Sequence, residues 1–311
     1  MTRYIKSFIN DTAIQAAVDD GVLGHPYVAL DDDLHKIDWD GKDINYAGMY
    51  LTIEAMESGD FYVRKACSYS KNGGEWVSVT GETAIAVENG DKVRFKGNSA
   101  PSSAFTGNTL SFNVFGNIHS FSSGDNFSGV TKAPWTEGGW AAFMFYNSTG
   151  LVSAEGFVLP ATTVSSNCYK RMFQGCTGMI KSPKILPALS VDMNAYEGLF
   201  NTCSSLEYGP VISATATTTQ QGLLYMFKGC TSLKKAPDLL IANLTPACYQ
   251  EMFKNCPNLS YVKCLATNPG SRTTKNWISG VSATGTFIKD ANTTWSTGAN
   301  GIPSGWTVIN A

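Results

Sequence analysis

Hydrophobic and polar residues follow two different rules along the chain, with a change near residue 128. Over residues 46–127, apolar and polar positions alternate in short runs such as 50–56 and 92–96, and turn residues such as Asn72-Gly73 separate the runs. A period of two is that of a half-buried β-strand, and Asn-Gly between two such runs is a strong hairpin signal. Seven or eight short strands at this spacing predict a β-sandwich-like module.

In the second half, one short phrase of the form Met-Phe-x-Gly-Cys returns again and again. Its last residue is Cys176, Cys203, Cys230 and Cys256, at intervals of 27, 27 and 26 residues, and a fainter copy ends at Ser148. A fixed period of this length is typical of stacked repeats, in which each unit buries its apolar face against its neighbours. The phrase therefore predicts a solenoid.

Within each repeat, the spacing predicts a short helix followed by a short strand. Apolar residues stand at positions i, i+1, i+4, i+5 and i+8 of segments such as 168–176, which is one face of an α-helix. Seven residues after the repeated Cys comes Pro183, Pro210 or Pro237, which ends an extended run because proline has no N–H to donate.

These patterns together predict an α+β multidomain protein with four parts. Residues 1–45 form a small N-terminal attachment module, and residues 46–127 form the β-sandwich-like module. Residues 128–265 form the solenoid with its period of about 27 residues, and residues 266–311 form a C-terminal β cap. The last part has to differ from the repeats, because an open apolar end would aggregate.

Composition and charge remove several classes of partner. Only 15% of the 311 residues are charged and the net charge is -2, so we expect neither nucleic acid nor an anionic membrane as a partner. The sequence contains no run of about 18 apolar residues, which is the length that a membrane-spanning helix needs. The first ten residues lack the apolar core of a signal peptide. If the chain is complete, we expect no export by the usual route.

The eight cysteines are expected to be free and buried. Four of them share the repeat slot of Cys176, and Cys168 and Cys248 share a second slot, which favours small packed side chains over disulfides. Zinc is a weaker alternative, because no C-x-x-C pair occurs. Residues 38–43 loosely resemble a calcium loop without its closing Glu, and we favour a solvated turn there. We therefore expect neither a metal nor a cofactor.

Residues 225–239, with Met226-Phe227, Gly229-Cys230 and the later Ala-Pro pair, resemble the BspA-like leucine-rich repeats. These repeats are abundant in surface proteins of Bacteroidales and in phages that infect them. The resemblance covers residues 143–265, and residues 301–308 look like the tail often attached to such repeats. It implies an adhesive scaffold with variable faces and no catalytic residues. A shorter stretch, residues 27–39, is similar in style to attachment segments of structural proteins in crAss-like phages.

The function that we expect from this is a non-enzymatic phage structural protein, a head or tail fibre or spike. Residues 1–45 would dock on other virion proteins, and the solenoid would adhere to a host-surface glycan or protein. Such a protein folds in the reducing host cytoplasm and acts as a homo-oligomer such as a trimer. The alternative is a bacterial cell-surface leucine-rich-repeat adhesin. A glycan depolymerase has less support, because no pair of carboxylates and no nucleophile motif stands out.

Candidate binding residues stand between the repeated positions. Five residues after the repeated Cys come Lys181, Tyr208, Lys235 and Tyr261, one in each repeat. A row of alternating Lys and Tyr suits stacking against sugars and hydrogen bonding to them, whereas the plainer interpretation is an unconstrained, solvated face. Trp76 is open to a similar sugar-stacking interpretation, but we favour a position in the core, because it adjoins a tight hairpin.

Overall fold

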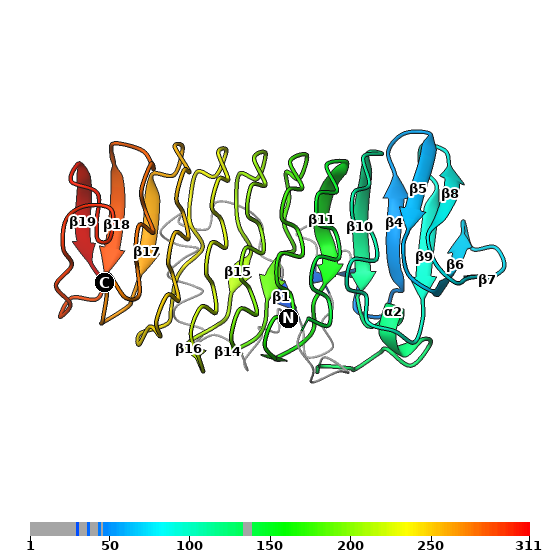
Figure 1. Cartoon of the computed structure of the whole chain (residues 1–311), viewed down its shortest axis with the longest axis horizontal. Coiled ribbons are helices and arrows are strands. Elements are labelled where there is room, and N and C mark those ends of the chain that lie inside the picture. Colours follow the sequence, from blue (N-terminus) through cyan, green and yellow to red (C-terminus); the bar gives the residue numbers. More distant parts are fainter. Residues whose placement is uncertain (1–28, 31–35, 38–42, 45, 133–138) are drawn as a thin grey trace.

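The structure is a computed structural model that describes residues 29–30, 36–37, 43–44, 46–132 and 139–311 (Figure 1). Most of the predicted attachment module, and with it the docking role of residues 1–45, lies outside the described residues. So does most of the calcium-like turn at residues 38–43. The described part of the module consists of three paired antiparallel strands, β1 (Ala29–Leu30), β2 (Lys36–Ile37) and β3 (Asp43–Ile44).

The alternating region folds into the short strands that its period of two predicts. Five of these strands and one later strand, β11, build a six-stranded sheet in the order β11-β10-β4-β9-β6-β7, with β5 and β8 as a separate antiparallel pair. The elements are β4 (Leu51–Ala55), β5 (Gly59–Val63), β6 (Cys67–Lys71), β7 (Val77–Val79), β8 (Thr83–Val87), β9 (Lys92–Lys96), β10 (Phe112–Asn117), α2 (Ser120–Ser123) and β11 (Leu151–Val158).

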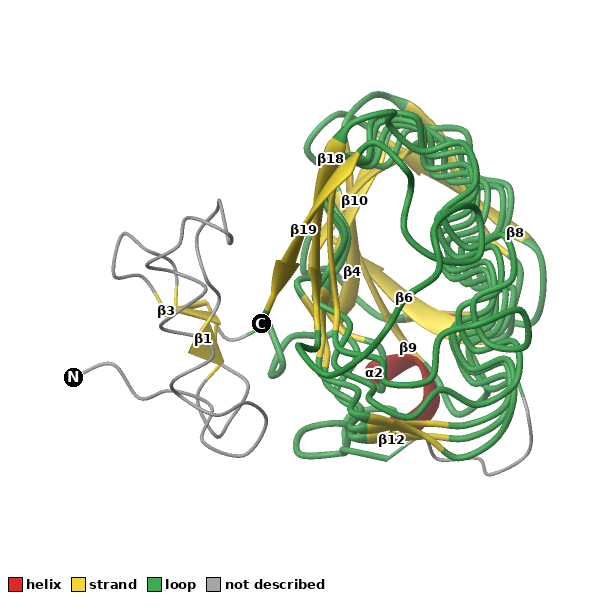
Figure 2. Ribbon diagram, turned by 90° about the vertical axis from the view of Figure 1, so that its left-hand side faces the viewer, coloured by secondary structure: helices red, strands yellow, loops and turns green. Residues whose placement is uncertain are grey.

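The repeats lie side by side in register, as Figure 1 shows. Each repeat is one rung, and its short strands pair parallel with those of the next rung, in the sets β12-β14-β16, β13-β15 and β17-β18-β19. Viewed end on in Figure 2, the long strands follow one side of the outline and stacked turns follow the other. The strands are β12 (Thr163–Val164), β13 (Ile185–Leu186), β14 (Ser190–Val191), β15 (Val211–Ile212), β16 (Ala216–Thr217), β17 (Tyr261–Cys264), β18 (Gly285–Lys289) and β19 (Trp306–Asn310).

Stacked phenylalanines form the centre of the core. One phenylalanine per rung is fully buried, and neighbouring rings lie 5.3–5.7 Å apart with nearly parallel planes. This offset stacking is a favourable arrangement of aromatic rings. Repeating one apolar phrase therefore fills the space between rungs with identical layers. The five rings are Phe145, Phe173, Phe200, Phe227 and Phe253.

The predicted repeat helices are absent, and the segments are ladders of turns. Cys168 N donates to Ser165 O and Met172 N to Tyr169 O, three residues back, where an α-helix requires four. The N–H groups between them donate to the next rung, as Tyr169 N does to Ala195 O. The described residues are nearly all β-strand and turn, and their only helix is the four-residue α2. The predicted α+β class is therefore wrong, and so is the helix-plus-strand unit that we expected to build a solenoid.

The physical reason for this error is a coincidence of periods. Apolar residues at i, i+4 and i+8 fit the 3.6-residue period of a helix, but they fit a four-residue turn equally well over so short a segment. The turn ladder requires a left-handed residue at every fourth position, and Asn167, Arg171 and Gly175 have φ of 57°, 52° and 78°. A left-handed residue interrupts a right-handed helix. The adjacent, similar rung supplies the hydrogen-bond partners that a helix would supply internally.

The stack begins earlier in the chain than the repeats suggested. Phe105 N donates to Met144 O, and the Phe105 ring stacks on Phe145 at 5.4 Å, so residues 101–108 form a rung within the predicted β-sandwich-like module. Strand β10 also pairs parallel with β11 across residue 128. One continuous cluster of buried residues runs from Leu51 to Trp306. Hydrogen bonding and core thus continue across this predicted boundary, and the division into four parts stays a prediction.

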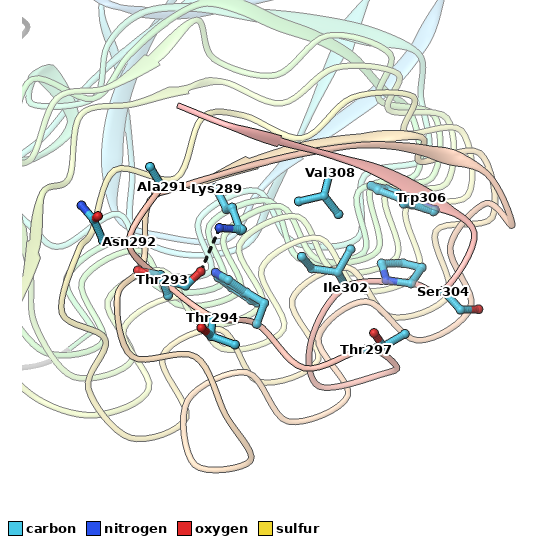
Figure 3. A pocket seen from close by; sticks show the side chains of 12 residues that line it. Lys289, Ala291, Asn292, Thr293, Thr294, Thr297, Ile302, Ser304, Trp306 and Val308 are labelled. Atoms are coloured by element: carbon cyan, nitrogen blue, oxygen red, sulfur yellow. Dashed lines mark hydrogen bonds between the residues drawn. The ribbon is translucent and has the colours of Figure 1, made fainter.

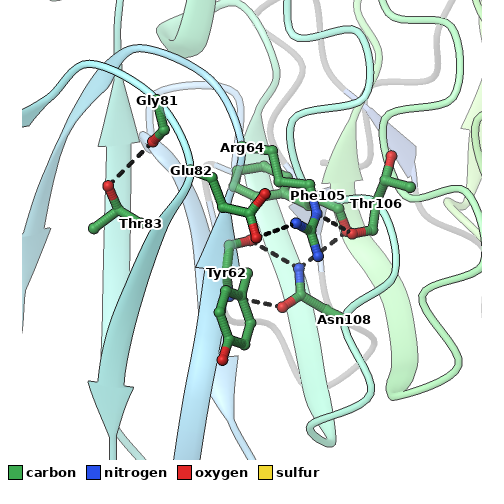
Figure 4. A network of polar contacts seen from close by, with 8 residues as sticks. All are labelled: Tyr62, Arg64, Gly81, Glu82, Thr83, Phe105, Thr106 and Asn108. Atoms are coloured by element: carbon green, nitrogen blue, oxygen red, sulfur yellow. Dashed lines mark hydrogen bonds and ion pairs between the residues drawn. The ribbon is translucent and has the colours of Figure 1, made fainter.

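A polar network fastens strand β5 to this first rung (Figure 4). The side-chain amide of Asn108 accepts a hydrogen bond from Tyr62 N and donates to Tyr62 O and to Phe105 O. Arg64 Nε donates to Thr106 O, and its guanidinium forms a 2.6 Å ion pair with Glu82. Because Asn108 is buried, these bonds satisfy polar groups that would otherwise destabilise the fold.

Candidate functional site

The four predicted binding residues lie in one line. Lys181, Tyr208, Lys235 and Tyr261 are joined in this order by parallel β-bridges, one residue in each rung. Residues that are opposite each other on adjacent strands point to the same face of a sheet. The structure therefore brings all four side chains together on the outer face of the stack.

This line continues in both directions, and sequence reasoning missed the additional positions. We name the whole line the sheet file. None of its side chains is buried, and each residue is the register partner of the next. The added residues were missed because their spacing is not that of the repeat, although strand alternation was a usable signal. The sheet file consists of Lys92, Glu54, Asn113, Ser153, Lys181, Tyr208, Lys235, Tyr261, Thr286 and Thr307.

Aromatic rings and cations alternate at the centre of the sheet file. The Tyr208 side chain is 46% exposed, the largest exposure of any aromatic residue in the described part of the chain. Lys234 Nζ lies 5.9 Å from the centre of its ring, and Lys235 Nζ lies 4.8 Å from the centre of the Tyr261 ring. Burial lowers the pKa of Lys235; Asp238 opposes this effect, and the nearby Lys263 adds to it.

Ion pairs between neighbouring rungs offset much of the charge beside the sheet file. Glu155 lies 3.0 Å from Lys181 Nζ and 3.2 Å from Lys184 Nζ. Burial alone would raise the pKa of Glu155, but its bonds to these two lysines outweigh that effect and lower it. Further pairs join Lys234 to Glu207 at 2.8 Å and Lys263 to Asp238 at 3.0 Å. The resulting surface is polar with charges of both signs, which suits a neutral ligand better than a strongly charged polymer.

The cysteine ladder is a packing and hydrogen-bonding device. All eight cysteines are free and buried, which confirms the prediction. The thiol of Cys203 donates to Phe173 O of the preceding rung at 3.0 Å, and the other three cysteines in this slot do the same. Burial raises the pKa of Cys168 and of Cys264 to about 12, so these thiols stay protonated and weakly nucleophilic. The described residues hold no group of three or more His, Cys, Asp or Glu side chains that could bind a metal ion.

Trp76 does not lie in the core, and our preferred interpretation of it was wrong. The residue is half-buried on the outer side of the sheet, where Lys96 Nζ lies 4.4 Å and the Arg94 guanidinium 5.4 Å from its ring. Tyr50 packs against it at 5.1 Å and donates a 2.6 Å hydrogen bond to Asp125. Trp76 is half-buried and is not a member of the sheet file, whose Tyr208 is 46% exposed, so the sheet file is the better candidate site.

Comparisons with known proteins found no similar protein. No protein-family model matches the chain, and neither curated proteins nor solved structures gave a match. Among the described residues, no helix has the length and apolar character needed to cross a membrane.

Proposed function

We propose that the protein is a non-enzymatic adhesion scaffold whose sheet file binds a host-surface glycan. The observation that supports this most is the unbroken register of the file, which aligns the exposed Lys181 and Tyr208 with the half-buried Lys235 and Tyr261. A weak contact that is repeated along the file raises the overall affinity for a repetitive ligand, so no single strong pocket is needed. A protein ligand is the alternative occupant of the same line.

The spacing of the rungs suits an extended ligand that lies along the stack. Adjacent strands are about 4.8 Å apart, so Tyr208 and Tyr261, two rungs apart, are separated by about 10 Å. An extended polymer parallel to the long axis in Figure 1 would meet an aromatic ring and an amine alternately. The mixed charges beside the file favour a neutral glycan chain. The exposed Tyr208 supplies both an apolar face and a hydroxyl group for such a chain, whereas the hydroxyl group of Tyr261 is buried.

For the setting, we propose a virion fibre or spike, with a bacterial cell-surface adhesin as the alternative. The resemblance of the repeats to BspA-like proteins supports both settings. Eight free, buried thiols suit folding in a reducing cytoplasm, which favours the virion. Docking through residues 1–45 belongs to this proposal as well.

The test is binding of the fluorescently labelled protein to a panel of Bacteroidales cells. Tyr208→Ala combined with Tyr261→Ala removes two aromatic contacts worth about 0.5–1.5 kcal/mol each, so binding should weaken by roughly fivefold to 150-fold. The matched control combines Tyr146→Ala with Tyr225→Ala, two half-buried tyrosines in the turn ladders, and should bind normally. Equal binding by both double variants would reject the sheet file as the adhesive surface.

A further inference from the structure

The sheet ends at the C-terminal side with an open edge. Strand β19, red in Figure 1, pairs with β18 on one side and has no strand partner among the described residues on the other. Such an edge presents N–H and C=O groups that template pairing with another strand. The bridges of the sheet file connect β17-β18-β19 to the six-stranded sheet, whose far edge is strand β7. Strand β7 has only three residues, and a short edge strand limits such pairing.

Strand β19 has none of the usual protection against edge pairing. Its sequence, Trp306-Thr-Val-Ile-Asn310, contains no charged residue and no proline. Val308 and Ile309 are 45% and 47% exposed, and they are among the most exposed large apolar side chains of the described residues. Both are β-branched, which favours pairing in a sheet. An edge of this composition favours pairing with a further strand.

The backbone direction shows which groups are available at this edge. Ala311 N donates to Lys289 O on β18. In a parallel ladder, alternate residues bond to the same neighbour, so Thr307 and Ile309 face β18 with Ala311. The N–H and C=O groups of Val308 and Asn310 therefore point away from β18, toward the open edge.

The inner side of this end is also incompletely covered. A hollow of about 380 Å³ lies there, and Figure 3 shows Val308 and Trp306 of β19 beside Ile302 and Lys289 at its border. The Lys289 ammonium group donates hydrogen bonds to Asp290 O and to Thr293 O, and Lys289 and Thr293 belong to its wall. A hollow thus borders β19 on the inner side of the last rung.

We propose that β19 is a self-association surface, on which a second copy of this chain adds its own β19 in antiparallel orientation. The strand is its own complement when the twofold axis passes through Val308. Val308 then faces Val308 of the second copy, and Thr307 faces Ile309 of the second copy. Cross-strand pairs of β-branched residues are favourable, and a strand without charges brings no like charges together.

The consequence is an end-to-end dimer with one continuous sheet. An isologous, twofold contact closes after two copies, so this surface does not build the trimer that we expected from the sequence. A five-residue edge is much smaller than a standard protein interface, so we expect association in the micromolar range. Each dimer would carry two sheet files in place of one, but dimer formation does not depend on the proposed glycan binding.

Sedimentation velocity of the full chain over roughly 1 to 100 μM, a range that brackets micromolar affinity, tests this proposal. The wild type should shift from monomer to dimer with concentration. Val308→Lys places two like charges opposite each other and should weaken dimerisation by roughly tenfold or more. Ile180→Lys adds the same charge at a side chain that is 50% exposed on another rung, and should dimerise normally. A wild type that stays monomeric, or equal association by the two variants, overturns the proposal.

A charge-swap experiment tests the identity of the partner and the register. Val308→Glu alone should also dimerise roughly tenfold or more weakly than the wild type, whereas a mixture of the Val308→Glu and Val308→Lys proteins should recover dimers, because opposite charges then face each other across the axis. Thermal melting of each variant shows whether it is folded. A wild type that dimerises while the mixture of folded variants does not would exclude the Val308 register and overturn the proposed pairing.

Discussion

Acidification should destabilise the protein through one buried histidine. The His119 imidazole is fully buried and stacks on Trp140, with ring centres 4.8 Å apart. Neither ring nitrogen has a hydrogen-bond partner among the described residues. Burial lowers the pKa of His119 from 6.5 to about 4, because the charged form would lose its hydration without gaining a partner.

The size of the effect follows from linkage. In the unfolded chain the imidazole binds a proton below its ordinary pKa of about 6.5, whereas in the folded chain it does so only below about pH 4. Between these values the unfolded state holds the additional proton, so the free energy of unfolding falls as the pH falls. At 1.36 kcal/mol per unit, the loss amounts to about 3 kcal/mol, a large part of a typical stability of 5–15 kcal/mol.

Urea denaturation between about pH 7 and pH 4 measures this loss. His119→Phe keeps a ring against Trp140 and removes the titrating group, so its stability should fall less over this range. Carboxylates that titrate below about pH 4.5 affect both proteins alike, and the difference between the two curves isolates His119. Parallel curves for wild type and variant would refute the reasoning.

Two further predictions concern the repeats. Cys203→Ser should leave the free energy of unfolding nearly unchanged, because Ser148 already donates the equivalent hydrogen bond to Phe105 O at 2.6 Å. Cys203→Ala removes the donor and should lower the free energy of unfolding by about 1 kcal/mol in urea denaturation. An equal loss in both variants would show that the hydrogen bond contributes nothing. Gly175→Ala should destabilise the protein by roughly 1–3 kcal/mol, because φ of Gly175 is 78° and the added methyl group would collide with the Asn147 side chain. The control is Gly270→Ala, whose added methyl group meets no atom within 4 Å. Equal thermal stability of the two variants would contradict this prediction.

The repeat period was the most informative part of the sequence. It placed Cys203 and its equivalents in one buried slot and placed Tyr208 in line with Tyr261, and both arrangements are present. These results follow because identical phrases at a fixed spacing stack in register, whatever the local backbone conformation is. The S–H donation from each Cys to the preceding rung required the structure, because it depends on the distance between rungs.

Local conformation was harder to predict. The spacing alone could not distinguish a helix from a turn ladder, but Asn167 and Gly175 at left-handed positions were an available sign. The first rung escaped notice because Phe105 is followed by Gly107-Asn108, without the Met and Cys of the phrase, and lies 40 residues before Phe145. Trp76 was misplaced because a period of two does not indicate which face of a sheet is covered.

Hydrogen–deuterium exchange, with and without polysaccharide isolated from a bacterial strain that the protein binds, tests the central claim most directly. The account predicts slower exchange in the peptides that contain Lys181, Tyr208, Lys235 and Tyr261. Peptides of the turn ladders, such as residues 168–176 and 222–230, should exchange at an unchanged rate. Slower exchange confined to the turn ladders, or no change in any peptide while the polysaccharide is bound, would contradict the assignment of the sheet file as the adhesive face.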